Sequence, residues 1–310
     1  MFDESFRVLF LSTPAKLSHR SKNLIISSQE RGEVSLPLKD ISTIIIDTPQ
    51  ITLSSSVLNA IAKYKILLFV CDESHLPSGN FLPYLSHYRN SQILQHQINL
   101  SKQRKSVLWQ KIIKAKISNQ SKLLKLQNQT QVAQKLEALS KSVHLNDTSN
   151  NEAKASMLYF PALFGKGFAR NENHPINSAL NYGYAIVRSV VVRNIVGSGL
   201  LPSLGIFHAN QFNPFNLADD LIEPYRPYVD SRVLSLDLRD ELELHHRLEL
   251  VNLLHTCVAL EGKVYPLHRA ITRSTWSLSR YICQLDDEVI LPILDEVSNG
   301  REIYESASDV

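Results

Sequence analysis

Apolar residues between positions 7 and 70 come in short aliphatic or β-branched runs that polar, Gly and Pro residues separate. Runs of this kind are typical of β-strands, because branched side chains pack well on a pleated surface. We therefore predict strands at residues 7–11, 23–26, 34–36, 41–46 and 66–70. Before the last of these, serines 54–56 are suitable N-cap residues for a short helix that runs through Lys63.

Beyond residue 90 the pattern becomes helical. From residue 92 to about residue 120, apolar side chains recur at roughly helical spacing with lysines between them. Further helices are predicted from near Glu152 and from Asn177, and the glycines at 197 and 199 would end the second one. The two patterns together predict an α+β protein with a small N-terminal β-rich domain at 1–75, a linker at 76–90 and a larger all-α domain at 91–310.

The net charge of the chain is only +3, but the charges are distributed unevenly along it. From Ser74 to Leu136 the chain contains no Asp or Glu and ten Lys or Arg residues. A solvated helix face normally mixes both signs, so the run indicates a surface for a polyanion. The candidate contacts are Lys102, Arg104, Lys105, Lys111, Lys114 and Lys116, with Arg170 and Arg226 further along the chain. The acidic stretch from Asp286 to the end is excluded as such a surface.

The cysteines and the N-terminal residues argue against several other classes of protein. The three cysteines are far apart and form no C-x-x-C pair, which argues against a disulfide framework and against a zinc ribbon. The first residues are acidic where a signal peptide would be basic, and no apolar run reaches the ~20 residues that span a bilayer. We expect a cytoplasmic protein without a membrane segment.

The segment from His208 to Glu223 carries the most informative polar residues. Asp220 and Glu223 are three positions apart, so in a helix both carboxylates project from one face. An imidazole nitrogen and several carboxylate oxygens suit a divalent ion such as Mg²⁺ or Mn²⁺. Glu152, in a predicted first helical turn, is a further acid, and Tyr159 on the same face is placed to contact a substrate. With the basic segment, these residues point to metal-dependent phosphodiester chemistry on nucleic acid.

Each of these residues also has an ordinary structural interpretation. Glu152 would be favoured by the helix dipole alone, and a lone histidine is more often a structural residue than a ligand. Asp220 and Glu223 are also common kinds of residue at a helix start, and Asp219 lies beside them. Spacing alone therefore leaves the choice of carboxylate open.

The sequence around these residues resembles that of a known family. The similar segments are Asn151-Glu-Ala-Lys-Ala, Tyr159-Phe-Pro-Ala-Leu-Phe-Gly165, Gly199-Leu-Leu-Pro-Ser-Leu-Gly-Ile-Phe-His208 and Leu217-Ala-Asp-Asp-Leu-Ile-Glu-Pro-Tyr-Arg-Pro227. Upstream, Leu38-Lys-Asp40, Trp109-Gln-Lys-Ile and Lys116-Ile-Ser-Asn-Gln120 also match, so the resemblance covers most of the chain. The family is the CRISPR-associated endonuclease one family, the integrase subunit of the spacer-acquisition complex, in the variant of type II loci.

The resemblance implies both a site and a reaction. The metal-binding and catalytic residues of the family fall on Glu152, His208 and Glu223, with Mg²⁺ or Mn²⁺ as the cofactor. Many members have Asp where this chain has Glu223, so Asp220 remains a second candidate for that ligand. The implied reaction is attack by a DNA 3′-hydroxyl on a phosphodiester at the edge of the CRISPR repeat, catalysed by the larger domain in prokaryotic antiviral immunity.

The resemblance also implies partners. These are double-stranded DNA as spacer precursor and as repeat, a second copy of the chain in a homodimer formed through the N-terminal domains, and a small second adaptation subunit. The RNA-guided effector nuclease of the locus is a further candidate. Two other functions stay open: a structure-selective repair endonuclease for branched or single-stranded DNA, and a non-catalytic DNA-binding scaffold, which would need no divalent ion.

Overall fold

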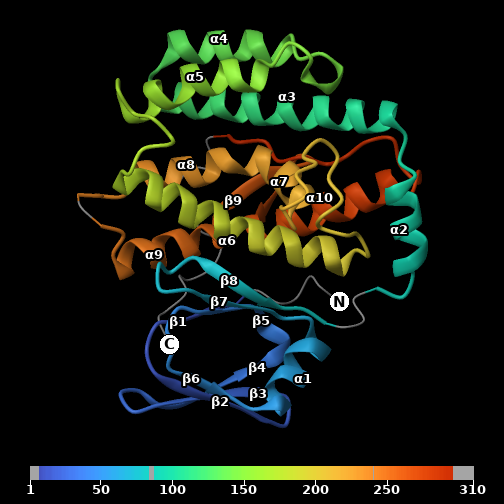
Figure 1. Cartoon of the computed structure of the whole chain (residues 1–310). Coiled ribbons are helices and arrows are strands. Elements are labelled where there is room, and N and C mark those ends of the chain that lie inside the picture. Colours follow the sequence, from blue (N-terminus) through green and yellow to red (C-terminus); the bar gives the residue numbers. More distant parts are fainter. Residues whose placement is uncertain (1–6, 84–86, 240, 296–310) are drawn as a thin grey trace. The chain divides into compact units, whose positions relative to one another are not determined.

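The computed structural model describes residues 7–83, 87–239 and 241–295. The chain divides between residues 86 and 87 into two compact units (Figure 1). The first unit is rich in strands and the second is mostly helical, so the predicted α+β class, with the β-rich part first, is confirmed.

The described part of the N-terminal unit contains two sheets. In one, β1 (Arg7–Leu11), β5 (Ile41–Ile46) and β7 (Leu67–Cys71) run parallel, and β8 (Pro77–Phe81) pairs antiparallel with β7. In the other, β2 (Ala15–Arg20), β3 (Asn23–Ser28) and β4 (Gly32–Pro37) form an antiparallel meander, and β6 (Ile51–Leu53) pairs parallel with β2. The connecting segments include the 3-10 turn η1 (Leu38–Asp40) and the helix α1 (Ser55–Tyr64).

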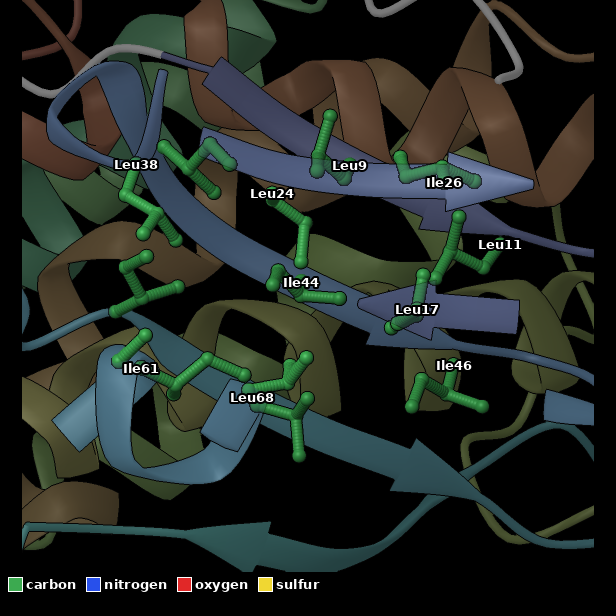
Figure 2. Packing of buried hydrophobic residues seen from close by; sticks show 14 residues of the cluster. Leu9, Leu11, Leu17, Leu24, Ile26, Leu38, Ile44, Ile46, Ile61 and Leu68 are labelled. Carbon is green, nitrogen blue, oxygen red and sulfur yellow. The ribbon is translucent and has the colours of Figure 1, made fainter. Parts of the chain in front are cut away.

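Aliphatic side chains from both sheets and α1 form the core of this unit. Every residue of β5 is buried, as expected for a central strand of a covered parallel sheet. Leu17, Leu24 and Ile44 are completely inaccessible to solvent, and Figure 2 shows them in one cluster with Ile61 of α1. The core therefore depends on shape and apolar area, with few directional contacts.

Three strands of this unit were not predicted from the sequence. Only one side chain of β2, Leu17, is buried, so the strand lacks an apolar signal and exists through its pairing with β3 and β6. The short β6 likewise pairs with β2. The third, β8, lies inside the predicted linker, and its Pro77 stands at the first position, where a missing N–H is tolerated. The boundary between the units falls after residue 86, within the range 76–90 that the sequence assigns to the linker.

The helical unit begins with α2 (Asn90–Ile98) and the long α3 (Lys102–Leu126), where the periodicity predicts one helix. They are separate because the Ser101 hydroxyl accepts a hydrogen bond from Arg104 N at 3.2 Å and caps α3. The other α-helices are α4 (Thr130–Lys141), α5 (Asn151–Phe164), α6 (Pro175–Gly197), α7 (Asn216–Ile222), α8 (Arg226–Leu234), α9 (Leu244–Asn252) and α10 (Leu267–Ile282). Short 3-10 turns are η2 (Leu145–Asp147), η3 (Glu223–Tyr225) and η4 (Leu253–His255).

The described residues of this unit include two strands, which the all-α prediction did not contain. Strands β9 (Cys257–Leu260) and β10 (Lys263–Pro266) form an antiparallel hairpin between α9 and α10. Helix α6 is the central element and packs against α7, α8, α9 and α10, while α3, α4 and α5 pack together as a second group (Figure 1). In the described part of the chain, no helix combines the length and apolarity needed to cross a bilayer.

Candidate active site

Two glutamates from separate elements meet at one lysine inside the helical unit. Lys116 of α3 has its Nζ 2.7 Å from Glu152 Oε1 of α5 and 2.5 Å from Glu223 Oε2 of η3. Only 7% of the Lys116 side chain and 4% of the Glu223 side chain is exposed, against 29% for Glu152, so the cluster opens to solvent on the Glu152 side. Burial by itself lowers the pKa of Lys116, but the charges of Glu223 and Glu152 outweigh it and the pKa is raised. The lysine is therefore a cation at neutral pH.

Glu152 lies in the first turn of α5, where the sequence predicts it. Asn150 precedes the helix with a left-handed φ of 52° and makes no side-chain capping bond. Asp147 caps the helix instead: Oδ1 accepts from Asn151 N and Oδ2 accepts from Glu152 N, each at 2.9 Å. The N-terminus of α5 is thus anchored in part by the backbone N–H of Glu152, the candidate metal ligand.

Glu223 begins η3 directly after α7 and is held from two sides. Arg226 Nε lies 3.1 Å from Glu223 Oε1. Asn119 of α3 donates from Nδ2 to the Pro224 carbonyl at 2.9 Å and ties the turn to α3. Burial by itself raises the pKa of Glu223, but Arg226 and Lys116 outweigh it and the pKa is lowered. Glu223 therefore remains a carboxylate although it is almost completely buried.

Asp220 holds the loop that carries His208. Its Oδ2 accepts hydrogen bonds from Ile206 N at 2.5 Å and Phe207 N at 3.2 Å, and Oδ1 accepts from His208 N at 3.1 Å. Oδ1 also lies 2.8 Å from His208 Nδ1. Because a carboxylate can only accept, Nδ1 carries the proton of the neutral ring, and in that form Nε2 keeps its lone pair. This hydrogen bond is the main reason that the pKa of His208 is raised, against the opposing effect of burial.

The His208 loop also depends on a glycine and an aromatic stack. A Cβ at Gly205 would lie 2.2 Å from the His208 carbonyl oxygen and 2.9 Å from Asp220 Oδ2, so a larger residue would displace the loop. Phe207 stacks on the buried Trp109 of α3 with ring centroids 4.3 Å apart, and Trp109 meets the His208 ring edge-on at 5.7 Å. Trp109 and Lys116 are two turns apart on α3, which therefore supports both the histidine and the glutamates.

The donor atoms suit a divalent ion, although three ligands do not yet surround one point. Glu152 and Glu223 converge on a cation, and the neutral form of His208 presents the lone pair of Nε2. Across residues 7–83, 87–239 and 241–295, no three His, Cys, Asp or Glu side chains form a ready-made ligand group. Lys116 Nζ occupies the position between the two glutamates. Carboxylate oxygens with one imidazole are nevertheless a chemically suitable set for Mg²⁺ or Mn²⁺.

Four of the basic residues predicted to contact DNA are engaged within the protein. Lys116 and Arg226 contact the buried Glu223, as described above. Arg104 Nη1 is 3.0 Å from Asp287 Oδ1, and Lys111 Nζ is 2.7 Å from Glu288 Oε2. Asp287 and Glu288 thus pair with two of the basic residues in the first half of α3. Burial and ion pairing divide the lysine run, and contact of these four residues with DNA stays a prediction.

The remaining basic candidates have looser surroundings. Arg170 donates from Nη1 to Asn177 Oδ1 at 2.6 Å and from Nη2 to Asn181 Oδ1 at 2.9 Å. Lys102 is exposed, and Lys105 and Lys114 are half-buried. Their contact with DNA stays a prediction.

A buried polar network behind Glu223 was missed by the sequence analysis. Tyr159 is completely buried and donates to Asp230 Oδ2 at 2.8 Å, so its predicted contact with substrate was wrong. The Tyr184 hydroxyl donates to the other Asp230 oxygen, and the Arg226 guanidinium lies 4.7 Å from the Tyr184 ring centroid. The network therefore supports Arg226, which contacts Glu223. Its members come from three helices, so no local spacing could reveal it.

The sequence profile described as "CRISPR associated protein Cas1" matches residues 9–249 of the 310 residues in this chain. The chain belongs to the Cas1 family. This confirms the resemblance found in the segments around Glu152, His208 and Glu223. The profile spans both structural units, so the family covers the N-terminal sheets as well as most of the helical unit.

Individual relatives agree with this membership. The CRISPR-associated endonuclease Cas1 of Neisseria meningitidis serogroup C (strain 8013) is 39% identical over 274 residues, which cover 87% of this chain and 90% of that protein. A casposase bound to an integration product has a TM-score of 0.75 at 19% identity, with 92% of each chain covered. One chain of a Cas6-RT-Cas1–Cas2 complex has a TM-score of 0.69 at 16% identity, covering 98% of this chain and 37% of that one. The two structures show a shared fold.

Proposed function

We propose that the protein is a metal-dependent DNA endonuclease and integrase that inserts short DNA fragments into a CRISPR array. The observation that carries this proposal is the convergence of Glu152 and Glu223 on one cation, beside a histidine held in a fixed tautomer. Two relatives support it: one is named an endonuclease, and a casposase of the same fold was captured with an integration product.

Three side chains would hold Mg²⁺ or Mn²⁺: Glu152 and Glu223 through carboxylate oxygens and His208 through Nε2. When bound, the ion supplies stabilisation of the charge that develops on the phosphate and lowers the pKa of the attacking hydroxyl. We favour Glu223 over Asp220 as the third ligand, because three backbone N–H groups and the His208 ring already use the Asp220 oxygens. Asp220 instead orients the histidine.

The protein's other groups prepare this site for a polyanionic substrate. Arg226 keeps Glu223 ionised in a buried position, and Asp147 holds Glu152 at the start of α5. The exposed side of Glu152 leaves an approach for a phosphodiester. The nucleophile is the 3′-hydroxyl of the incoming DNA end, and water in its place would give hydrolysis by the same residues. Integration and cleavage therefore require the same arrangement.

The proposed partners are double-stranded DNA, a second copy of this chain and a small Cas2-type subunit. Support for the last comes from the fold shared with one chain of a Cas6-RT-Cas1–Cas2 complex. DNA as the substrate is supported by the casposase captured with its integration product.

Strand transfer of a short duplex into a repeat-containing DNA tests the ligand assignment. We expect Glu152→Gln, His208→Ala and Glu223→Gln each to reduce the rate by at least about a thousandfold, because the ligands act on the transition state. Duplex affinity should persist, since phosphate contacts elsewhere supply it. Glu137→Gln is the matched control, because Glu137 pairs with Lys125 and Lys141 on the surface and should leave activity unchanged. Undiminished transfer in excess EDTA, or activity in all three variants, would refute the metal site and favour a scaffold.

A second experiment tests the DNA surface. Reversing Lys102, Lys105 and Lys114 to Glu should weaken binding to every duplex sequence alike, because lysines contact phosphate rather than bases. The slope of log K against log salt should fall by about 0.9 for each DNA phosphate that the variant no longer neutralises. The control is the reversal of Lys125, Lys135 and Lys141, which changes the net charge equally. An unchanged slope in the first triple variant, or an equal decrease in both, would refute a DNA surface at Lys102, Lys105 and Lys114.

A further inference from the structure

Lys116 places a positive charge between the two carboxylates that would bind the proposed metal ion. The lysine is 6% exposed, and its ammonium contacts one oxygen of each glutamate. With Arg226, the cluster of two cations and two carboxylates is already neutral. A divalent ion added to this cluster without another change would leave two uncompensated positive charges in a nearly buried site, which is costly.

The two cations also compete for the same atoms. Mg²⁺ binds carboxylate oxygens at about 2.0–2.1 Å. The oxygens that face the cluster, Glu152 Oε1 and Glu223 Oε2, lie 2.7 Å and 2.5 Å from Lys116 Nζ. An ion that bridged these oxygens would touch the ammonium and repel it. Arg226 does not compete in this way, because its Nε contacts the other oxygen of Glu223.

We propose that Lys116 and the divalent ion exchange with each other at Glu152 and Glu223. The inference rests on the metal site proposed above. In the ion-free protein the ammonium bridges the two carboxylates and, together with Arg226, neutralises them, so the site is organised before the ion arrives. When the ion binds, the lysine leaves, which its flexible four-carbon stem allows. Arg226 stays in place. Lys116 is thus a positioning residue that lowers the affinity of the site for the ion.

Calorimetric titration of Mn²⁺ into the DNA-free protein tests the exchange. Lys116→Met removes the charge while retaining most of the apolar stem, and we expect this variant to bind Mn²⁺ at least tenfold more tightly than the wild type. Lys125→Met is the matched control. It makes the same substitution on the same helix, at a lysine 2.7 Å from Glu137, and should bind Mn²⁺ as the wild type does.

The outcomes separate this inference from the proposed function. If folded Lys116→Met binds Mn²⁺ no more tightly than the wild type, the exchange is overturned and the metal site stands. If neither protein binds Mn²⁺, the metal site and the exchange both fail. Tighter binding in Lys116→Met alone supports the exchange.

The wild type provides a readout that does not depend on the variant folding. Lysine acetylation, followed by mass spectrometry, should modify Lys116 slowly in EDTA, because the ammonium is buried in its ion pairs. In saturating Mg²⁺ the rate at Lys116 should rise at least threefold, while the rate at Lys125 stays constant. An unchanged rate at Lys116, under conditions where Mg²⁺ supports strand transfer, would overturn the exchange.

Discussion

The interiors of the two units are built from different kinds of residue. In the N-terminal unit the core is aliphatic, and the buried polar residues among its described positions are Ser42, Thr43 and Asp47. In the helical unit Lys116 and Glu223 are buried beside many other polar side chains. Apolar burial is non-directional, so it stabilises a fold without fixing individual atoms. Buried charges need defined partners, so they position a site but tolerate little change.

This contrast predicts that a polar truncation in the helical unit costs more than an apolar one in the N-terminal unit. The largest effect is expected for Asp220→Ala, which leaves three backbone N–H groups of the His208 loop without an acceptor. We expect a decrease of about 4 kcal/mol in the free energy of unfolding and at least a hundredfold slower strand transfer. Urea unfolding and the transfer assay measure these, with Asp219→Ala as the neighbouring control. If Asp220→Ala lowered the free energy of unfolding by less than about 1 kcal/mol, polar truncation in the helical unit would not be the more costly change.

A smaller effect is expected in the aliphatic core. Leu24→Ala removes a completely buried side chain of β3 and should cost about 3 kcal/mol of unfolding free energy. Leu24→Met retains most of the volume and should cost less than about 1.5 kcal/mol. Urea unfolding compares the two. Equal losses of unfolding free energy in Leu24→Ala and Leu24→Met would mean that this core depends on the exact shape of the leucine, as the polar interior depends on defined partners.

The smallest effect concerns the pH dependence of the buried network. Burial raises the pKa of Asp230 to about 6 from its ordinary value of 3.8. The folded state therefore binds this proton more tightly than the unfolded state, and the stability so gained is lost as pH rises through 6. Between pH 4 and pH 7 the wild type should lose about 2 kcal/mol relative to Asp230→Asn, because one pKa unit corresponds to about 1.4 kcal/mol.

Unfolding free energies of both proteins at the two pH values measure this difference. Asp237→Asn, at an exposed carboxylate of the same unit, is the control and should track the wild type at both pH values. A constant difference between the wild type and Asp230→Asn would show that Asp230 is ionised throughout.

The fold was predictable where a local pattern decides it. The expected limits of β1 and β5 coincide with those observed, and α6 ends at Gly197 as the sequence indicates. The strands that escaped prediction are mostly polar (β2), only three residues long (β6) or contain Pro and Gly (β8), and they exist through pairing with a neighbour. The partner of β6, β2, is distant in the chain and leaves no local signal, whereas β8 pairs with the preceding β7 but its Pro and Gly residues are typical of a loop.

The site was predictable in its residue types but less so in their roles. Glu152 and Glu223 both contact Lys116, and the family segments had placed the two glutamates in one site. Nothing in the acid-free run distinguishes Lys116 from Lys114, however, since only burial separates them. Asp220 and Glu223 looked equivalent because they are three positions apart. They differ because α7 ends between them and the His208 loop folds back on Asp220.

The stack of Phe207 on Trp109 makes the site visible by fluorescence. The chain has two tryptophans, and 65% of Trp276 is exposed whereas Trp109 is completely buried. In a Trp276→Phe protein the remaining emission would come from an indole that touches both Phe207 and the His208 ring. A shift to longer wavelengths would then report that the His208 loop has lifted and admitted water, and an unchanged spectrum would report that it has stayed closed.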